Sequence, residues 1–238
     1  MVSNTNKKIS DSLIKNILIV CPTELEAKFL IKDKSPYIEN PLLYSLDEIH
    51  LHADILISGI GQIQTAYNLL KTLSEKDYSL VLHIGICGAF SKKLSLGQIV
   101  NINSECFADL GVETKGGMTS IFEMGLIEKN KFPFSNSKLI NTKASLSFFD
   151  KYVNVKGISV NSISLDKEKN RKKEIQFAAE VESMEGATVF YICLRENINF
   201  AELRAVSNFV GESDKSLWKT EESIANLNKA TIEFLSEI

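Results

Sequence analysis

The sequence predicts an α/β domain in which helices cover a β-sheet. Short runs of β-branched and other apolar residues alternate with segments of helical periodicity, which is the pattern of strands connected by helices. The chain has 238 residues, of which 44% are hydrophobic and 24% are charged. Such a chain can bury a full core without disulfide bonds. We therefore expect one folded domain over residues 16–238, preceded by a flexible polar extension over residues 1–15.

Six segments have the composition of strands, and six have the periodicity of helices. The expected strands are NILIVC (16–21), DILISG (54–59), SLVLHIG (79–85), GQIVNINSEC (97–106), VNVKGISV (153–160) and FAELRAVS (200–207). The expected helices are TELEAKFLIK (23–32), QIQTAYNLLKTL (62–73) and segments near 137–150, 169–178, 184–196 and 216–236. Residues 115–134 contain glycines and aromatic residues without periodicity, which indicates a long functional or interface loop.

Charge and cysteine usage exclude several classes of function. The net charge of −3 and the dispersed lysines leave no basic field for nucleic acid or an anionic membrane surface. The four cysteines stand singly in apolar runs, which is typical of reduced core thiols. The first fifteen residues are polar, and no run reaches the roughly 18 apolar residues of a membrane span. We expect a cytoplasmic protein whose partner is a small molecule or another subunit, with no metal.

The first candidate catalytic residue is Glu26, which follows the first expected strand. Thr23 and Glu26 have the spacing of a capping box, in which the acid reaches back to the start of a helix. The same turn also opens into the crevice where ligands of an α/β sheet bind. The spacing therefore allows two interpretations of Glu26, a helix cap or a base that holds a water molecule.

The second candidate is Glu185, in the first turn of an expected helix. Residues 184–194 are apolar around the whole circumference, which predicts a buried central helix. The helix dipole favours a carboxylate at this end, yet burial without a partner would cost on the order of several kcal/mol. Either the dipole alone explains Glu185, or sugar hydroxyls donate hydrogen bonds to the ionised acid.

Two glycine turns, SGIGQ (58–62) and HIGICGAF (83–90), each accompany an expected strand. Neither completes the glycine pattern of a dinucleotide-binding turn or a P-loop. They are explained as tight turns, although their backbone amides can also line a ligand crevice.

Five motifs occur in the order and spacing of one known family. They are ILIVCPTELEA, SGIGQIQTA, GICGAF, VESMEGA and LRAVSN. Together they resemble the purine nucleoside phosphorylase and nucleosidase superfamily over residues 16–236, and most closely its nucleosidase branch, which includes methylthioadenosine/S-adenosylhomocysteine nucleosidase and futalosine hydrolase. The resemblance implies a three-layer αβα sandwich with a mixed, partly barrel-like central sheet. It also implies one nucleosidase-like catalytic domain in a homodimer or higher homo-oligomer, and we expect no cofactor.

The resemblance carries roles to individual residues. Glu26 matches the acid that positions and deprotonates the attacking water, and Glu185 with Met184 matches the pair that holds the ribose. On the strand of the last motif, Arg204 and Ser207 match residues that support the site. The position that faces the purine is Asn208, and the candidate crevice-lining residues are Gly59, Ile86, Cys87, Gly88, Val160 and Asn161.

Asn208 departs from the adenine-specific nucleosidases that this sequence resembles, which have an aspartic acid there that protonates the leaving base at N7. An amide cannot supply a proton, but its NH2 group can donate hydrogen bonds to N7 and O6 of a 6-oxopurine. An amide can also pair with adenine through N6 and N7. The oxo base is favoured because SNFVG, GISVNSIS (157–164) and FADLG (107–111) resemble futalosine hydrolases.

Charge favours water over phosphate as the nucleophile. The hexameric phosphorylases have phosphate-binding arginines at two places that here hold His83 and the acidic TELE segment. Phosphate would meet Glu24 and Glu26 without a guanidinium group to offset them. The resemblance thus implies a futalosine hydrolase, which releases hypoxanthine and dehypoxanthinyl futalosine in menaquinone biosynthesis. The alternatives are a methylthioadenosine/S-adenosylhomocysteine or aminodeoxyfutalosine nucleosidase that releases adenine, and a non-catalytic nucleoside-binding protein.

Overall fold

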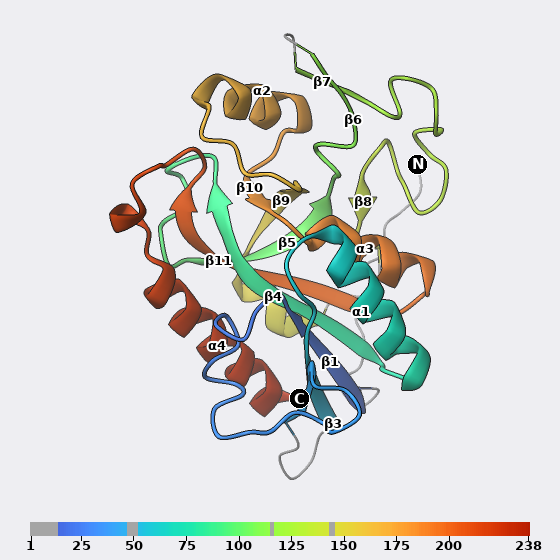
Figure 1. Cartoon of the computed structure of the whole chain (residues 1–238), viewed down its shortest axis with the longest axis vertical. Helices are drawn as coiled ribbons and strands as arrows, with labels where there is room; N and C mark the ends of the chain where they lie inside the picture. The colour runs from blue at the N-terminus through green and yellow to red at the C-terminus, as the bar shows by residue number, and fades with distance from the viewer. Residues whose placement is uncertain (1–13, 47–51, 115–116, 143–145) are drawn as a thin grey trace.

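The computed structural model describes residues 14–46, 52–114, 117–142 and 146–238. Residues 1–13, most of the expected N-terminal extension, lie outside these ranges. Within them a nine-stranded mixed sheet forms the centre of the molecule (Figure 1). Its strands are β1 (Asn16–Cys21), β2 (Leu43–Ser45), β3 (His52–Ile57), β4 (Leu80–Ala89), β5 (Ile99–Glu105), β8 (Leu139–Ile140), β9 (Val153–Ser159), β10 (Val181–Ser183) and β11 (Phe200–Phe209). Strands β6 (Gly111–Thr114) and β7 (Gly117–Ser120) pair with each other in a second sheet.

Five strands of the main sheet close into a barrel. Their order is β4-β11-β5-β9-β10, and β10 then pairs antiparallel with β4, with Glu182 opposite Gly88. Strands β1, β3 and β2 continue beyond β4 as an open sheet. This arrangement confirms the predicted mixed, partly barrel-like sheet.

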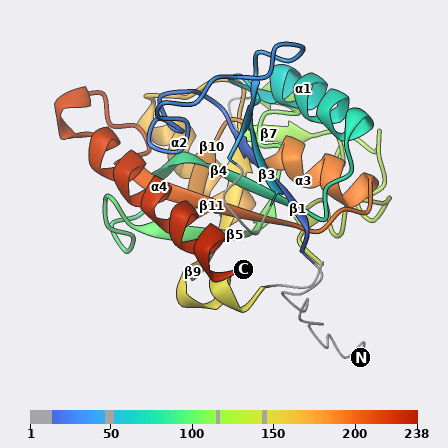
Figure 2. The same ribbon diagram turned by 90° about the horizontal axis from the view of Figure 1, so that it is seen from below.

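Helices cover the sheet on both faces. The helices are α1 (Gln62–Glu75), α2 (Lys167–Phe177), α3 (Gly186–Arg195) and α4 (Thr220–Glu237), of which α1, α3 and α4 cover the main sheet, and there are 3-10 turns at Ser147–Lys151 and Lys215–Leu217. Ile17 and Ile19 of β1 belong to the same core cluster as Phe234 of α4, whereas Leu18 belongs to the cluster that contains Phe190 of α3. Because alternate residues of a strand point to opposite faces, β1 is buried on both sides. Figure 2 shows α4 on one side of the strands and α1 with α3 on the other, which confirms the three predicted layers.

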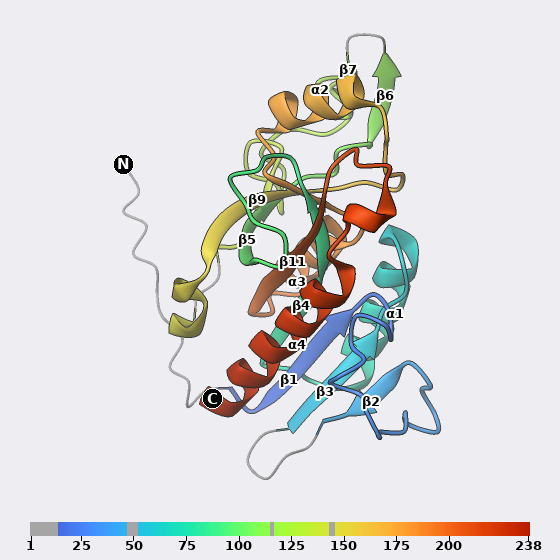
Figure 3. The same ribbon diagram turned by 90° about the vertical axis from the view of Figure 1, so that its left-hand side faces the viewer.

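The second sheet and α2 project beyond the barrel (Figure 3). Strand β7 therefore occupies the start of the segment that we expected to be a long loop, and residues 121–134 follow it mainly as turns. No helix in the described part of the chain is both long and apolar enough to cross a membrane.

Two of the expected helices are wrong. Residues 23–32 form successive turns, because Asn228 of α4 takes the backbone groups that a helix would pair internally. Its Oδ1 accepts from the N–H groups of Phe29 and Leu30, each at 3.2 Å, and its Nδ2 donates to the carbonyl of Glu26 at 2.6 Å. The segment 137–150 contains β8 and the start of a 3-10 turn instead of a helix, with residues 143–145 outside the described ranges.

Candidate active site

A cavity of about 290 Å³ lies where β1, β4, β10 and β11 end. The carboxyl ends of β1, β4 and β11 meet at one edge because these strands are parallel, and ligands of α/β sheets bind at such an edge. The cavity brings together eight residues of the predicted site, which are Glu26, Ile86, Cys87, Gly88, Met184, Glu185, Ser207 and Asn208.

Glu26 is buried and held at both carboxylate oxygens. Thr23 Oγ1 donates to Oε2 at 2.7 Å, and the Ile86 N–H donates to Oε1 at 3.0 Å. Burial raises the pKa of Glu26, while these two hydrogen bonds and the charge of Arg204 oppose the rise. No α-helix begins after Thr23, so a helix cap does not account for Glu26. A carboxylate with a raised pKa is suited to accept a proton from water.

Glu185 lies on another wall of the same cavity, at the residue before α3. The Gly61 N–H donates to its Oε1 at 2.9 Å, and Arg204 Nη1 lies 3.7 Å from its Oε2. Gly61 has a φ of 82°, a conformation that favours glycine, and this turn at the start of α1 points its N–H at Glu185. Met184, next in the chain, also lines the cavity.

Arg204 is 1% exposed and is held by two buried neighbours. Its Nε donates to Glu202 Oε1 at 2.6 Å, and its Nη2 lies 3.1 Å from His83 Nε2. Burial acts to raise the pKa of Glu202, but Arg204 and His83 hold it below its usual value. Burial and the charge of Arg204 lower the pKa of His83, which keeps the imidazole neutral. Arg204 and Glu202 therefore form an ionised pair inside the barrel.

Two glycines make room for this buried network. A Cβ on Gly85 would lie 2.1 Å from Arg204 Nη1 and 3.2 Å from Glu26 Oε1. A Cβ on Gly186 would lie 2.4 Å from Glu105 Oε1 and 2.8 Å from Glu202 Oε1. Burial and the neighbouring carboxylate of Glu202 raise the pKa of Glu105 well above its usual value, which favours the neutral acid. The network thus places one guanidinium close to the carboxylates at 26 and 185.

The amide of Asn208 has a defined orientation. Ser207 Oγ lies 2.8 Å from Asn208 Oδ1, and Asn208 Nδ2 donates to the Phe209 carbonyl at 3.1 Å. A flipped amide would bring its oxygen against the Phe209 carbonyl, which cannot donate a hydrogen bond. One N–H of Nδ2 therefore remains available as a donor in the cavity. Cys87 beside it is buried, which raises the pKa of its thiol to about 12 and makes it a poor nucleophile.

Three residues that we expected in the crevice do not line this cavity. Gly59 has a φ of 83° and donates its N–H to the Pro22 carbonyl at 3.1 Å. Val160 is 1% exposed and lines a neighbouring cavity, and Asn161 bonds to Asp109 through its backbone and side-chain nitrogens. Val160 and Asn161 follow the end of β9, where the chain turns toward α2.

The neighbouring cavity is larger, at about 600 Å³, and lies between α2 and the β6–β7 sheet. It contains neither Glu26 nor Glu185, and its three lysines at 169, 172 and 173 are each paired with a glutamate. No group of three or more His, Cys, Asp or Glu side chains in the described ranges could hold a metal ion. The smaller cavity is therefore the candidate active site.

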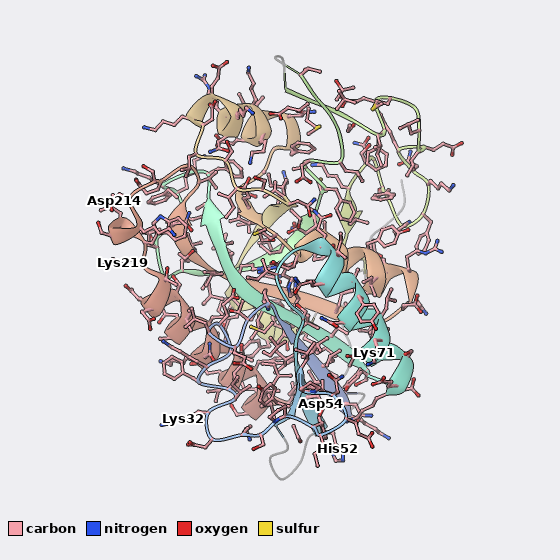
Figure 4. The ribbon with its side chains drawn as sticks, viewed as in Figure 1. Lys32, His52, Asp54, Lys71, Asp214 and Lys219 are labelled. Atoms are coloured by element: carbon pink, nitrogen blue, oxygen red, sulfur yellow. The ribbon has the colours of Figure 1, made fainter. Side chains whose placement is uncertain are left out.

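Another buried polar cluster surrounds Asp54 of β3. Tyr78 OH and Lys76 Nζ donate to its Oδ2 at 2.7 and 2.6 Å, and its Oδ1 accepts from a second tyrosine. Lys219, which precedes α4, donates its backbone N–H at 2.8 Å to the carbonyl of Ser207, a residue that lines the cavity. Figure 4 shows Asp54 far from Lys219. The Asp54 cluster is remote from the cavity and stabilises the outer strands of the sheet.

The sequence motifs assigned no role to Glu202 and Glu182, two of the buried acids of this region. Glu202 stands two residues before Arg204 on an expected strand, so the period of two already placed both on one face. Glu182 belongs to the VESMEGA motif but lies on β10, a strand of three residues that the sequence pattern did not predict. Glu182 lines the cavity and forms an ion pair with Lys173.

The model of the phosphorylase superfamily matches residues 16–238. The chain belongs to this superfamily. The match confirms the family that the five motifs predicted. Within the phosphorylase superfamily, the futalosine hydrolase of Thermus thermophilus is 29% identical to this chain over 223 residues, which cover 92% of this chain and 95% of that protein. The futalosine hydrolase of Streptomyces coelicolor is 28% identical over 182 residues, covering 74% and 76% of the two chains.

Solved structures of other proteins share the fold at lower identity. The futalosine hydrolase of Helicobacter pylori superposes with a TM-score of 0.77 at 15% identity, over 96% of this chain and all of that one. The 5′-methylthioadenosine/S-adenosylhomocysteine nucleosidase of Helicobacter pylori superposes with a TM-score of 0.77 at 16% identity, over 94% of this chain and 99% of the other. These likenesses confirm the predicted nucleosidase-like fold.

Proposed function

We propose that this protein hydrolyses the N-glycosidic bond of futalosine and releases hypoxanthine and dehypoxanthinyl futalosine, a reaction of menaquinone biosynthesis. The observation that carries the proposal is the placement of Glu26, Glu185 and Asn208 around one cavity. The likeness to the futalosine hydrolases of Thermus thermophilus and Streptomyces coelicolor supports the substrate. Residues 16–238 would act as a single catalytic domain.

In the proposed reaction Glu185 and Glu26 act on the sugar and on water. Glu185 accepts hydrogen bonds from the ribose hydroxyls, and the Gly61 N–H and Arg204 support its ionised form. The glycosidic bond loosens toward an oxocarbenium-like state. Glu26 then draws a proton from the water that attacks the anomeric carbon, which is general-base catalysis.

Asn208 serves the leaving base. The N–H of Nδ2 that is not bonded to the Phe209 carbonyl donates to the edge of hypoxanthine that carries N7 and O6, and it stabilises the negative charge that gathers there, as the donors of an oxyanion hole do. Because an amide has no acidic proton to give, the base leaves as a hydrogen-bonded anion or takes its proton from solvent.

The test is to incubate the purified protein with futalosine, inosine, methylthioadenosine and aminodeoxyfutalosine, each with and without phosphate, and to follow the free base by chromatography. We expect hypoxanthine from futalosine at a rate that phosphate does not change. Adenine from the amino substrates without hypoxanthine from futalosine would support the second candidate, an adenine-releasing nucleosidase. That candidate is favoured by the ability of an amide to pair with N6 and N7 of adenine. No release of base from any substrate would support a binding protein.

Exchanging the amide for an acid should change which base is released. In Asn208→Asp the side chain loses its NH2 donor and gains a group that can protonate N7, so we expect hypoxanthine release to fall and adenine release to rise. Loss of a hydrogen bond to a charged leaving group corresponds to roughly ten- to a hundredfold in kcat/KM. Rates on futalosine and aminodeoxyfutalosine, measured side by side, check this. An unchanged ratio of the two rates would remove Asn208 as the residue that discriminates between the bases.

We also propose that the protein is a homo-oligomer. Ile60, Ile63, Tyr67 and Leu70 are between 45% and 84% exposed at the start and along one side of α1. Exposed apolar residues at helical spacing mark an interaction surface. Light scattering after size-exclusion chromatography should give a mass of at least twice 26.6 kDa, and a monomer at every concentration would contradict the proposal.

A further inference from the structure

The candidate active site contains a third carboxylate that the proposed mechanism does not use. Glu182 lines the same cavity as Glu26, Glu185 and Asn208, and it is 5% exposed. A buried carboxylate in a binding cavity costs free energy unless something binds it. The position of Glu182 in the sheet and the partners of its carboxylate oxygens therefore indicate which atoms of a ligand it faces.

Strand pairing places Glu182 and Asn208 on either side of Gly88. In the barrel, Glu182 of β10 is paired with Gly88 of β4, and Gly88 is paired with Asn208 of β11. Residues paired across neighbouring strands point to the same face, and two strand spacings amount to roughly 10 Å. A Cβ on Gly88 would lie 3.3 Å from Asn208 Nδ2, so the absent side chain leaves space beside that amide. This span is wide enough for a purine with a hydrogen bond at each end.

Lys173 favours the ionised form of Glu182. Its Nζ donates to Glu182 Oε2 from α2, in an ion pair whose side chains are 15% and 4% exposed. Burial raises the pKa of Glu182 and the charge of Lys173 opposes this. The other oxygen, Oε1, accepts no hydrogen bond from the described residues, whereas both oxygens of Glu26 do. An ionised carboxylate with one oxygen unused presents only an acceptor to the cavity.

Hypoxanthine and adenine, the two candidate leaving bases, differ at ring atom N1 as well as at position 6. Hypoxanthine carries a hydrogen on N1 and is a donor there, whereas N1 of adenine carries a lone pair and is an acceptor. A base whose N7 and O6 face Asn208 turns its N1 toward the opposite side of Gly88, where Glu182 lies. Resting on the proposed hydrolysis of a hypoxanthine nucleoside, we infer that Glu182 selects the 6-oxopurine by accepting a hydrogen bond from N1–H through Oε1. Adenine is rejected there because its N1 lone pair would face a carboxylate.

The test compares Glu182→Gln with the wild-type protein on two nucleosides that share the futalosine arm, one with hypoxanthine and one with adenine. Glutamine keeps the shape but offers both a donor and an acceptor, so adenine is no longer repelled. We expect the ratio of kcat/KM values, hypoxanthine over adenine substrate, to fall by roughly ten- to a hundredfold. The matched control is Glu180→Gln, because Glu180 lies two residues away with an exposed side chain and should leave the ratio unchanged.

A second measurement does not depend on how the variant folds. Hypoxanthine and 1-methylhypoxanthine are titrated into the wild-type protein by calorimetry, because methylation removes the N1 hydrogen without changing N7 or O6. We expect the methylated base to bind at least about tenfold more weakly, and the difference to shrink in Glu182→Ala, which also makes room for the methyl group. Equal binding of the two bases, or an unchanged substrate ratio in Glu182→Gln, would overturn the inference while leaving futalosine hydrolysis intact. Release of adenine alone by the wild-type protein would overturn both.

Discussion

Replacing Glu26 by glutamine should lower kcat for release of the base by about a hundred- to ten-thousandfold, the range that general-base catalysis supplies. Glutamine can still accept from the Ile86 N–H and can donate to Thr23 Oγ1, so the cavity keeps its shape. It cannot accept the proton of a water molecule. Initial rates under saturating substrate measure the change, and KM should move little because Glu26 acts on water rather than on the sugar.

Stability distinguishes this role from a structural one. Burial raises the pKa of Glu26, so the folded state binds the proton more tightly than the unfolded state. This tighter proton binding stabilises the folded state at any pH below the pKa that Glu26 has in the unfolded chain. The stabilisation is lost as the pH rises through the higher pKa that Glu26 has in the folded protein. At neutral pH the wild-type protein carries a buried charge that glutamine lacks, and Glu26→Gln should melt at an equal or higher temperature. A variant that keeps full turnover, or one that loses activity only because it unfolds, would contradict the assignment.

Glu24→Gln provides the matched control. Glu24 stands two residues earlier in the same turn, is exposed, and accepts a hydrogen bond from Tyr44 OH at 2.8 Å. A glutamine oxygen can accept the same bond, so turnover should stay close to the wild-type value. The wild-type pH profile of kcat/KM should rise on its acidic side as Glu26 ionises, at a pH above that of a free glutamate because the pKa is raised. That rise should be absent in Glu26→Gln.

The sequence predicted the long strands because each carries a continuous apolar run, and it did not predict the two- and three-residue strands β2, β8 and β10, which are too short to show a pattern. Strand β10 has three residues, and it is a strand only because β4 and β9 flank it. The segment after β1 has helical periodicity, yet the buried amide of Asn228, about two hundred residues later, takes its backbone groups. Propensity within a window cannot include such distant partners.

The residues of the candidate site also fall into two groups, those that the sequence motifs identify and those whose position depends on strand pairing. Glu26, Glu185 and Asn208 could be proposed from the sequence because each lies in a recognisable motif. Glu182 lies in one of those motifs as well, but its relation to Asn208 depends on the closure of the barrel between β10 and β4. Val160, in the GISVNSIS segment, was expected in the crevice, but the turn after β9 directs it to the neighbouring cavity.

Replacing Arg204 by methionine should lower the free energy of unfolding by about 3–5 kcal/mol, the usual loss when one member of a buried ion pair is removed. Glu202 and Arg204 are at most 1% exposed, so no water replaces the guanidinium. Arg204 holds the pKa of Glu202 below its usual value, so the ionised Glu202 stabilises the folded protein at any pH above its pKa in the unfolded chain. That stabilisation is lost as the pH falls through the lower pKa that Glu202 has in the folded protein. In Arg204→Met this contribution is lost at neutral pH, and we expect Glu202 to be protonated in the folded variant.

Urea unfolding of three further variants separates the effect of the lost charge on stability from the effect of the lost packing. Arg204→Met combined with Glu202→Leu should recover part of the loss, because no unpaired carboxylate then remains in the barrel. Lys151→Met removes a cation from an exposed pair with Glu233, whose side chains are 43% and 44% exposed, and should change stability by no more than about 1 kcal/mol. Arg204→Lys keeps a charge but not the planar group that reaches Glu202, His83 and Glu185 together, so it should fall between the wild type and Arg204→Met. If the double variant is as unstable as Arg204→Met, the loss comes from packing, and the ion pair is not what stabilises this part of the barrel.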